Sequence, residues 1–464
     1  MIVKELPTLP PTGTPAISRT AAYWPLFVLV AINILNFYDR QVFGAVVEPI
    51  RKEFSLSDTQ LGLINTAFTV LYGFVGLPLG LLADKVSRKR LLASGIVVWA
   101  ALTASARWVF SYPFLVAGRL GVGVGEAVCA PTATSWIGDL FPPERRAKPL
   151  ALFMLGVPVG GALSFFFSGP IAYKFGWRAA MMLAAAPALL LVPILLMLRE
   201  PQRGASEHRI APPAGSVWQV LRIPTFWWIA ISGALVNFNL YAIGVFLPAF
   251  FGRIHHMNVA KAGITMGVLY SIGGVLGGVI AGAWGDRVAR RRANGRMLIA
   301  AGAALASAPL AYTGIQVSPD WQIALGSVVG KNDLWMVPLA VLLLTPAYGL
   351  LNMYYGLVYS AIQDIVPARL RATSMAIYFL VMYLLGASWG SVIIGKLSDR
   401  WARHAAYLAH SPTVTETFKA IGLQQAMLVI PLLSVGLAVV LWAGSRTIKK
   451  DMERRQELSE SISA

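Results

Sequence analysis

The chain has 464 residues, of which 56% are apolar and only 13% are charged, about half the charged share of a soluble globular domain. A soluble protein of this length would need a charged shell around at least two domains, and this composition cannot supply one. The net charge of +18 could suit nucleic acid, but the mean hydropathy of +0.64 indicates an integral membrane protein.

Long apolar segments recur along the whole chain. Most lack Asp, Glu, Lys and Arg altogether, and all are close to or above the roughly 20 residues that cross a bilayer as a helix. The twelve predicted spans cover residues 21–47, 59–83, 91–110, 112–141, 149–173, 179–198, 223–252, 262–285, 297–319, 334–363, 372–395 and 420–445. Strands of a β-barrel would be shorter and would alternate, so the prediction is an all-α integral membrane protein.

The basic residues predict the orientation of these spans. With the N-terminus inside, 25 of the 39 lysines and arginines fall in inside segments, 11 fall outside and three lie within spans. This asymmetry follows the positive-inside rule and predicts a multi-pass protein of the cell membrane (inner or plasma membrane) with both termini cytoplasmic. Because the basic residues are spread over many loops, no nucleic-acid partner is expected.

Two sequence motifs occur twice, which divides the chain into halves. Residues 80–90 (GLLADKVSRKR) match residues 282–292 (GAWGDRVARRR), and residues 139–147 (DLFPPERRA) match residues 364–372 (DIVPARLRA). Parallel repeats of six helices with a site between them are typical of one class of secondary transporter. The predicted organisation is a tail (1–22), a six-helix bundle (23–198), a cytoplasmic linker (199–225), a second six-helix bundle (226–443) and a cytoplasmic tail (444–464).

These motifs resemble those of the major facilitator superfamily. Residues 80–90 are similar to its loop signature after helix 2, and residues 119–125 (RLGVGVG) to its helix 4 signature. Within that superfamily the chain resembles the spinster family of lipid transporters, through residues 36–40 (NFYDR), 54–63 (FSLSDTQLGL) and 118–127 (GRLGVGVGEA). The resemblance implies two pseudo-symmetric six-helix bundles that move a substrate by alternating access.

Four charges lie inside predicted spans 1 and 4, namely Asp39, Arg40, Arg119 and Glu126. A charge in hydrocarbon costs a few kcal/mol, so each is expected to have a function or a partner. The helical rise places Asp39 and Arg119 nearly level and Glu126 about 10 Å deeper than Arg119, on the same helix face. The four residues are therefore expected to form one polar column.

The interpretation of this column is proton coupling. Asp39 or Glu126 would take up a proton, while Arg40 or Arg119 would compete with that proton or bind an anionic headgroup, together with Asn36 of the same motif. The spinster resemblance implies these roles at the same positions. The alternative is two structural ion pairs that hold spans 1 and 4 together.

The spans of the second half carry no such charges. They offer Asn237, Asn352 and Tyr355 as candidate cavity residues, although aromatic side chains at helical spacing usually serve helix packing. One ionic half and one aromatic half suit an amphiphile, with its headgroup toward the first half.

The repeated acidic and basic loops form a second kind of candidate site. Asp84 and Arg88 in the first half, with Asp286 and Arg290 in the second, are predicted to gate one face of the protein by pairing with neighbouring helix ends. Positive charge that merely sets topology would explain the arginines but not the repeated aspartate.

Catalytic and cofactor signatures are missing from the sequence. There is no metal-ligand pattern of Cys and His and no Gly-Lys-Ser/Thr phosphate loop, so neither an enzyme nor a bound cofactor is expected. The prediction is a monomeric, proton-coupled secondary transporter of a lysophospholipid- or sphingolipid-like amphiphile, with membrane lipids and protons as its other partners. The rival predictions are a proton-coupled symporter of a small organic anion such as a sugar acid, and a passive channel.

Overall fold

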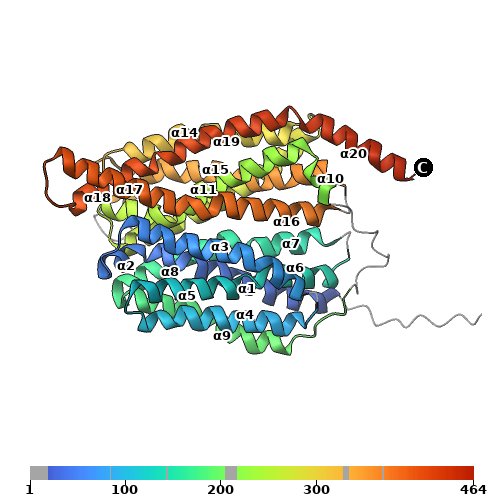
Figure 1. Cartoon of the computed structure of the whole chain (residues 1–464), viewed down its shortest axis with the longest axis horizontal. Helices are drawn as coiled ribbons and strands as arrows, with labels where there is room; N and C mark the ends of the chain where they lie inside the picture. The colour runs from blue at the N-terminus through green and yellow to red at the C-terminus, as the bar shows by residue number, and fades with distance from the viewer. Residues whose placement is uncertain are drawn as a thin grey trace, which may run out of the picture.

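The computed structural model describes residues 19–83, 85–142, 145–203, 217–327, 334–367 and 370–463, and helices dominate these residues (Figure 1). Among them, 12 helical stretches are long and apolar enough to cross a membrane, which confirms the predicted all-α fold.

The spans of the first half are α1 (Arg19–Ala45), α3 (Asp58–Ala83), α4 (Arg88–Ala104) with η1 (Ser105–Trp108), α5 (Tyr112–Glu126) with α6 (Cys129–Leu140), α7 (Ala147–Met154) with α8 (Gly156–Phe175), and α9 (Trp177–Met197). Those of the second half are α11 (Pro224–Arg253), α12 (Val259–Val268) with η3 (Leu269–Val275) and α13 (Leu276–Ala289), α14 (Gly295–Gln316), α15 (Leu339–Ile365), α16 (Arg371–Met382) with η5 (Tyr383–Ala387) and α17 (Ser388–Leu408), and α18 (Glu416–Met427) with α19 (Val429–Ser445). Short helices lie outside the spans: α2 (Val47–Glu53), α10 (Val217–Leu221) and α20 (Ile448–Ser463).

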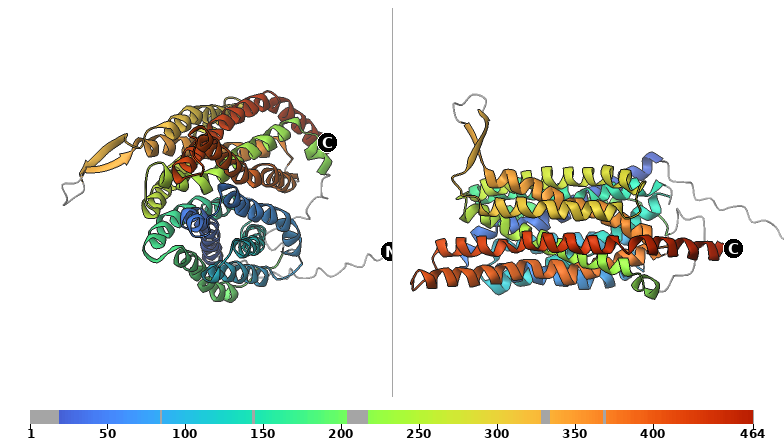
Figure 2. Two further views of the ribbon diagram at one scale, coloured as in Figure 1. Left: turned by 60° about the vertical axis from the view of Figure 1, so that its left-hand side comes forward. Right: turned by 90° about the horizontal axis from the view of Figure 1, so that it is seen from above.

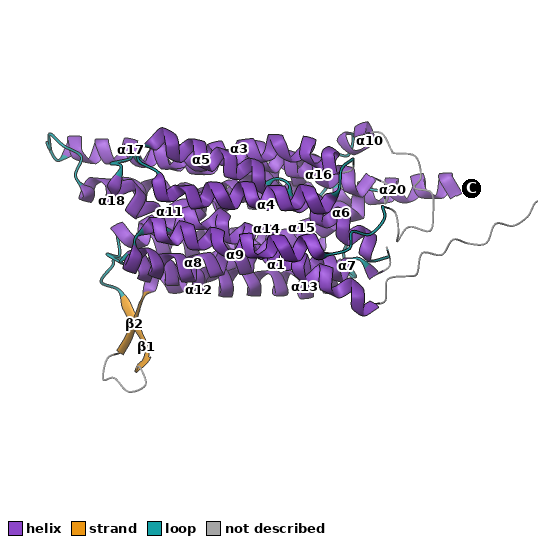
Figure 3. Ribbon diagram, turned by 90° about the horizontal axis from the view of Figure 1, so that it is seen from below, coloured by secondary structure: helices purple, strands orange, loops and turns teal. Residues whose placement is uncertain are grey.

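The long helices run side by side, so the molecule has two ends (Figures 1 and 3). We call the end that carries α20 and the C-terminus the terminus end. The opposite end, with α2 and α18, carries a two-stranded antiparallel hairpin of β1 (Gln322–Ser327) and β2 (Leu334–Pro338) that projects sideways from the bundle (Figures 2 and 3). We call it the hairpin end.

The predicted spans differ from the structure most at the ends of two of them. The span predicted over residues 334–363 begins instead at Leu339, because residues 334–338 pair with β1 and Pro338 has an extended backbone. The span predicted to end at residue 395 continues as α17 to Leu408, and Ser398 and Asp399 in this extension find partners at the hairpin end.

The helices of each half group together, with the two groups facing one another (Figure 2). The main packing between the halves joins α8 to α12 and η3, and α3 to η5 and α17. These elements lie between the middle of the bundle and the hairpin end. The segments of the same spans at the terminus end, α13 and α16, pack mainly on helices of their own half.

Glycines allow the backbones of the two halves to touch near the hairpin end. A Cβ atom at Gly44 of α1 would lie 2.2 Å from the carbonyl oxygen of Gly244 in α11. At the α8–α12 contact, a Cβ at Gly169 would lie 2.6 Å from the carbonyl oxygen of Val259. Side chains cannot fit at such distances, so small residues set the close approach, as they do in other membrane helix pairs.

Candidate functional site

The four predicted charges meet in the middle of the first half, between α1 and α5. Asp39, Arg40, Arg119 and Glu126 are 1%, 6%, 3% and 0% exposed, respectively. Glu126 lies at the last residue of α5, where the span is interrupted before α6 and its Pro131. The predicted cluster is therefore present, and all four of its members come from the first half.

Helical rise places Asp39 and Arg119 at nearly the same depth, but the ion pair in this cluster joins its other two members. Arg40 Nε and Nη2 each lie 3.1 Å from Glu126 Oε2, which makes a buried ion pair between α1 and α5. Asp39 Oδ2 instead accepts a hydrogen bond of 2.8 Å from the Thr103 hydroxyl of α4. Arg119 Nη2 donates to the Arg40 carbonyl oxygen at 3.5 Å. The side chains of Arg40 and Glu126 together span the difference in depth that helical rise gives between their backbones.

Two carboxylate oxygens in this cluster lack a donor. Asp39 Oδ1 and Glu126 Oε1 are buried and have no hydrogen-bond partner, although the two carboxyl groups lie within hydrogen-bonding reach of one another. Two carboxylates repel, whereas a carboxylic acid can donate a hydrogen bond to a carboxylate. A single proton held between Asp39 and Glu126 would therefore remove the repulsion between the two carboxyl groups.

Aromatic rings enclose the two guanidinium groups. The Arg40 guanidinium lies 4.3 Å from the ring centre of Tyr72 and 4.7 Å from that of Phe37. Arg119 lies 5.0 Å from the ring centre of Phe68. Such cation–π contacts stabilise a desolvated cation without neutralising its charge. The arginines therefore keep their positive charge available for a carboxylate or an anion.

The candidate residues of the second half are uncharged and partly joined to one another. The Tyr355 hydroxyl of α15 donates a 2.9 Å hydrogen bond to Asn237 Oδ1 of α11, and Asn237 is buried. Asn352 Nδ2 donates to the Tyr348 carbonyl oxygen one turn back in its own helix. In the first half, Asn36 Nδ2 is buried without a partner. The structure thus joins Asn237 to Tyr355, whereas Asn352 forms a hydrogen bond within its own helix.

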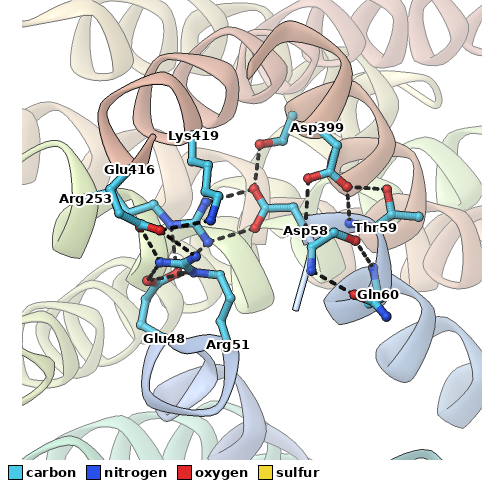
Figure 4. A network of polar contacts seen from close by, with 11 residues as sticks. Glu48, Arg51, Asp58, Thr59, Gln60, Arg253, Asp399, Glu416 and Lys419 are labelled. Atoms are coloured by element: carbon cyan, nitrogen blue, oxygen red, sulfur yellow. Dashed lines mark hydrogen bonds and ion pairs between the residues drawn. The ribbon is translucent and has the colours of Figure 1, made fainter. Parts of the chain in front are cut away.

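A polar network that the sequence did not reveal joins the two halves at the hairpin end (Figure 4). Arg253, the last residue of α11, donates from Nη2 to Asp58 Oδ1 at 2.7 Å and from Nε to Glu48 Oε1 at 2.7 Å. Arg51 of α2 pairs with Glu416 of α18 at 2.5 Å. The side chains of Arg253 and Arg51 are only 4% and 2% exposed, and their ion pairs act as a clasp between the halves. We call these five residues the hairpin-end clasp.

A helix cap crosses the same interface. The Asp399 carboxylate of α17 accepts hydrogen bonds from the backbone N–H groups of Asp58 and Thr59, at 3.0 and 2.9 Å (Figure 4). The first N–H groups of a helix have no partner within it, so a carboxylate there replaces water. A residue of the second half thus caps α3 of the first half.

A cavity of about 690 Å³ lies beside the clasp, between α2, the junction of α11 and α12, and α18. Residues of both halves line it, and they include Lys52 and Glu48 from the first half with Arg253, Asn258 and Glu416 from the second. The clasp therefore forms part of a hollow that is open at the hairpin end and is shaped by the contact between the halves.

At the terminus end, Arg88 is fully buried and its contacts stay within the first half. It pairs with Asp139 of α6 at 2.5 Å and with Glu200 at 3.1 Å. Glu200 also accepts from the Ser87 hydroxyl and from the backbone N–H of Arg88, so it caps α4. Although burial alone would raise it, these hydrogen bonds hold the pKa of Glu200 below its usual range. In this conformation Arg88 joins neighbouring helix ends of one half.

The second half also has an ion pair between helix ends at the terminus end. Asp364, which the repeat aligns with Asp139, forms an ion pair with Arg296 near the start of α14. The predicted Arg290 is exposed, six residues earlier. α13 extends to Ala289, which the repeat aligns with Ser87, so α14 begins later in the repeat than α4 does. Asp84 and the side chain of Asp286 lie outside the described residues.

Comparison with known proteins places these features in a family. The Major Facilitator Superfamily pattern matches residues 29–391. An MFS-type efflux pump of Mycolicibacterium smegmatis is 28% identical over 428 residues, which cover 92% of this chain and 93% of that protein. Protein spinster homolog 1 of Homo sapiens is 28% identical over 402 residues, or 81% of this chain and 73% of that protein.

A solved structure agrees with the fold. The crystal structure of a bacterial homolog to the human lysosomal transporter Spinster, in an inward-facing and unoccupied conformation, matches with a TM-score of 0.81 at 26% identity. The match covers 94% of this chain and 99% of that one. Because the family pattern spans most of the twelve-helix chain, this protein belongs to the major facilitator superfamily and is a membrane transporter similar to the spinster proteins.

Proposed function

We propose that this protein is a proton-coupled secondary transporter of an amphiphilic, lipid-like substrate. The observation that carries the coupling is the pair of buried carboxyl groups, Asp39 and Glu126, each with an oxygen that lacks a donor. A buried carboxyl group is either ionised beside a cation or protonated, and this cluster offers a cation beside two carboxyl groups that can take up a proton. Arg40 holds Glu126 at 3.1 Å in the state described here.

Proton uptake would change the partner of Arg40. When Glu126 is ionised, the ion pair ties α1 to α5, and when Glu126 is protonated, the attraction is lost. A proton can drive a conformational change only if the two conformations bind it with different affinity. If Arg40 pairs with Glu126 in one conformation and leaves it in the other, the two conformations bind the proton with different affinity. The effect is large because charges interact strongly in a buried cluster.

The alternating conformations would be related by movement of one half against the other. The main contacts between the halves lie from the middle of the bundle to the hairpin end, which supports a state closed at that end. The excess of basic residues in the loops at the terminus end supports a cytoplasmic location for both termini and a location in the cell membrane. On this proposal, the state described here opens toward the cytoplasm.

The substrate class follows from the contrast between the halves. Arg119 keeps Nη1 without a partner and is a cation for an anionic headgroup, while the second half offers tyrosines and the Asn237–Tyr355 pair. A lysophospholipid or sphingolipid carries a charged headgroup and a chain that aromatic side chains can contact. The protein would carry such a molecule with its headgroup toward α1 and α5.

Uptake into liposomes with an imposed pH gradient tests this function. We expect a labelled lysophospholipid to accumulate with the gradient, and a sugar acid to accumulate in its place if the substrate is a small anion. Glu126→Gln and Asp39→Asn should each abolish the response to the gradient and leave exchange at equal pH. Asp320→Asn, at an exposed residue of the hairpin end, is the matched control. Full gradient response in the double variant would disprove coupling through this cluster.

A further inference from the structure

Two spans of the second half contain a π-helical segment in their middle. Among the described residues, η3 (Leu269–Val275) interrupts the span of α12 and α13, and η5 (Tyr383–Ala387) interrupts that of α16 and α17. A π-helical turn accommodates an additional residue and has weaker backbone bonding, and such turns are frequent at functional sites. Both segments belong to the spans that carry the main packing between the halves.

Each π-helical segment presents a tyrosine to the other half. Tyr383 of η5 lies 5.4 Å, between ring centres, from Tyr72 of α3. Tyr270 of η3 lies 5.0 Å from Phe165 of α8. The two contacts are thus equivalent in kind, because each places a ring from an irregular turn against a ring on a regular helix of the first half.

Only the Tyr383 contact leads to the charged cluster. The ring of Tyr72 is the one that lies 4.3 Å from the Arg40 guanidinium, and Arg40 pairs with Glu126. A continuous series of contacts therefore runs from Glu126 through Arg40 and Tyr72 to Tyr383. Phe165, the ring beneath Tyr270, is fully buried in an apolar core. The two tyrosines make similar ring contacts, but Tyr270 is buried and Tyr383 is half-buried, and their electrostatic surroundings differ.

The backbone around Tyr383 is held on its other side. A Cβ atom at Gly386 of η5 would lie 2.2 Å from the carbonyl oxygen of Ala234 in α11. The segment therefore rests directly on the backbone of α11, while its tyrosine ring reaches toward α3. Tyr241 of α11 completes the contact, with its ring centre 6.3 Å from that of Tyr383. A shift of the Tyr72 ring would be transmitted to α11 through this segment.

We propose that Tyr383 is a positioning residue that couples the Arg40–Glu126 pair to the conformation of the second half, with η5 as the deformable turn. This inference rests on the proposed proton coupling. When Glu126 loses its charge, Arg40 loses its ionic partner and the Tyr72 ring remains as its main contact. The ring pair of Tyr72 and Tyr383 then carries the change across the interface.

The test measures conformation directly, as a function of pH. Spin labels at Lys148→Cys of α7 and Arg287→Cys of α13, in a Cys129→Ala background, report the opening at the terminus end by electron paramagnetic resonance. In the otherwise unchanged protein we expect the distance distribution to shift with pH. Tyr383→Leu should reduce that shift at least fivefold, and Tyr383→Phe should restore it, because the contact depends on the ring.

Two further variants separate coupling from simple packing. Tyr72→Leu should give the same loss as Tyr383→Leu, and the double variant should be no worse than either, since both remove one contact. Tyr270→Leu, the matched control, should slow transport and keep the pH shift. If Tyr383→Leu keeps the full pH shift while Glu126→Gln abolishes it, the role of Tyr383 is wrong and proton coupling stands. If the unchanged protein shows no pH shift, both proposals are wrong.

Discussion

The two ends of the molecule use the same chemistry for different purposes. At the hairpin end, buried arginines pair with carboxylates of the opposite half, as Arg253 does with Asp58 and Glu48. At the terminus end, Arg88 pairs with Asp139 and Glu200 within the first half. Contacts across the halves must break when the halves separate, and contacts within one half need not. The difference therefore separates residues that govern conformation from residues that hold a half together.

A carboxylate caps the first turn of one helix at each end of the molecule. Asp399 accepts two backbone N–H groups at the start of α3, and Glu200 accepts two at the start of α4. Each cap satisfies donors that the helix itself cannot. Asp399 comes from the opposite half, whereas Glu200 follows α9 of the same half. Removal of either capping carboxylate should destabilise the start of its helix to a similar extent. Loss of Asp399 should also change the conformation of the protein, and loss of Glu200 should not.

The largest effect is expected for Arg253→Gln. Arg253 and Asp58 are both 4% exposed in their side chains, and removal of one member of a buried pair costs about 3–5 kcal/mol. Because the pair exists only when the hairpin end is closed, we expect the population to shift strongly toward a state open at that end. Distances between spin labels on α2 and α18 should measure the shift.

Arg178→Gln is the control for that experiment. Arg178 also lies at the hairpin end, but it pairs with Glu53 of its own half, and both side chains are partly exposed. The hydrogen bonds from Arg178 hold the pKa of Glu53 below its usual range. A partly exposed pair contributes about 0–1 kcal/mol, so we expect no change in the label distances. Equal shifts in both variants would show that charge at this end, and not the clasp, sets the conformation.

A smaller effect of a different kind is expected for Arg88→Gln. The charged hydrogen bonds of Arg88 should contribute about 2–3 kcal/mol, less than the clasp because Asp139 and Glu200 are less buried than Asp58. We expect a lower melting temperature in detergent and unchanged label distances at both ends. A population shift without loss of stability would assign Arg88 to a gate, as its sequence motif first suggested.

Asp399→Ala should come next. Loss of a helix cap costs about 1–2 kcal/mol, and here the cap forms only in the closed state of the hairpin end. We expect a modest shift toward opening, in the same direction as Arg253→Gln. Asp399→Asn should have a smaller effect, since asparagine also caps helices. An unchanged population in Asp399→Ala would mean that water replaces the cap without cost.

The sequence was sufficient for the spans, the two halves and the cluster of four charges, because each depends on composition or helical spacing. Asp39 and Glu126 are conspicuous in an apolar segment, and their neighbourhood follows from the rise of a helix. The pairing of Arg40 with Glu126 was not predictable, because helical rise places only the backbone, whereas two long side chains reach toward one another across the difference in depth.

The hairpin-end clasp was missed because its members are ordinary in sequence. Glu48, Arg51 and Arg253 lie at span ends, where charged residues are common and usually solvated. Only the packing of the two halves shows that they are buried together. The histidines illustrate the same limit, since His255 lies in a predicted loop yet packs on Phe250, and burial lowers its pKa to about 4.

The smallest effect, and the one with a pH signature, is expected for Glu200→Gln. Hydrogen bonds to its carboxylate lower the pKa of Glu200 in the folded protein, so the ionised form favours folding. This contribution is complete above the ordinary glutamate pKa of about 4.3 and is lost as the pH falls through the lowered value.

At pH 7 we therefore expect Glu200→Gln to be less stable by about 1 kcal/mol, the usual contribution of a helix cap. The melting temperatures of the variant and the unchanged protein should converge below about pH 4. Asp320→Asn, at an exposed position, should show no such convergence. At each pH the label distances in Glu200→Gln should equal those in the unchanged protein, because Glu200 and α4 move together. A difference in stability that persists in acid would show that the loss arises from packing around Arg88 and not from the charge of the cap.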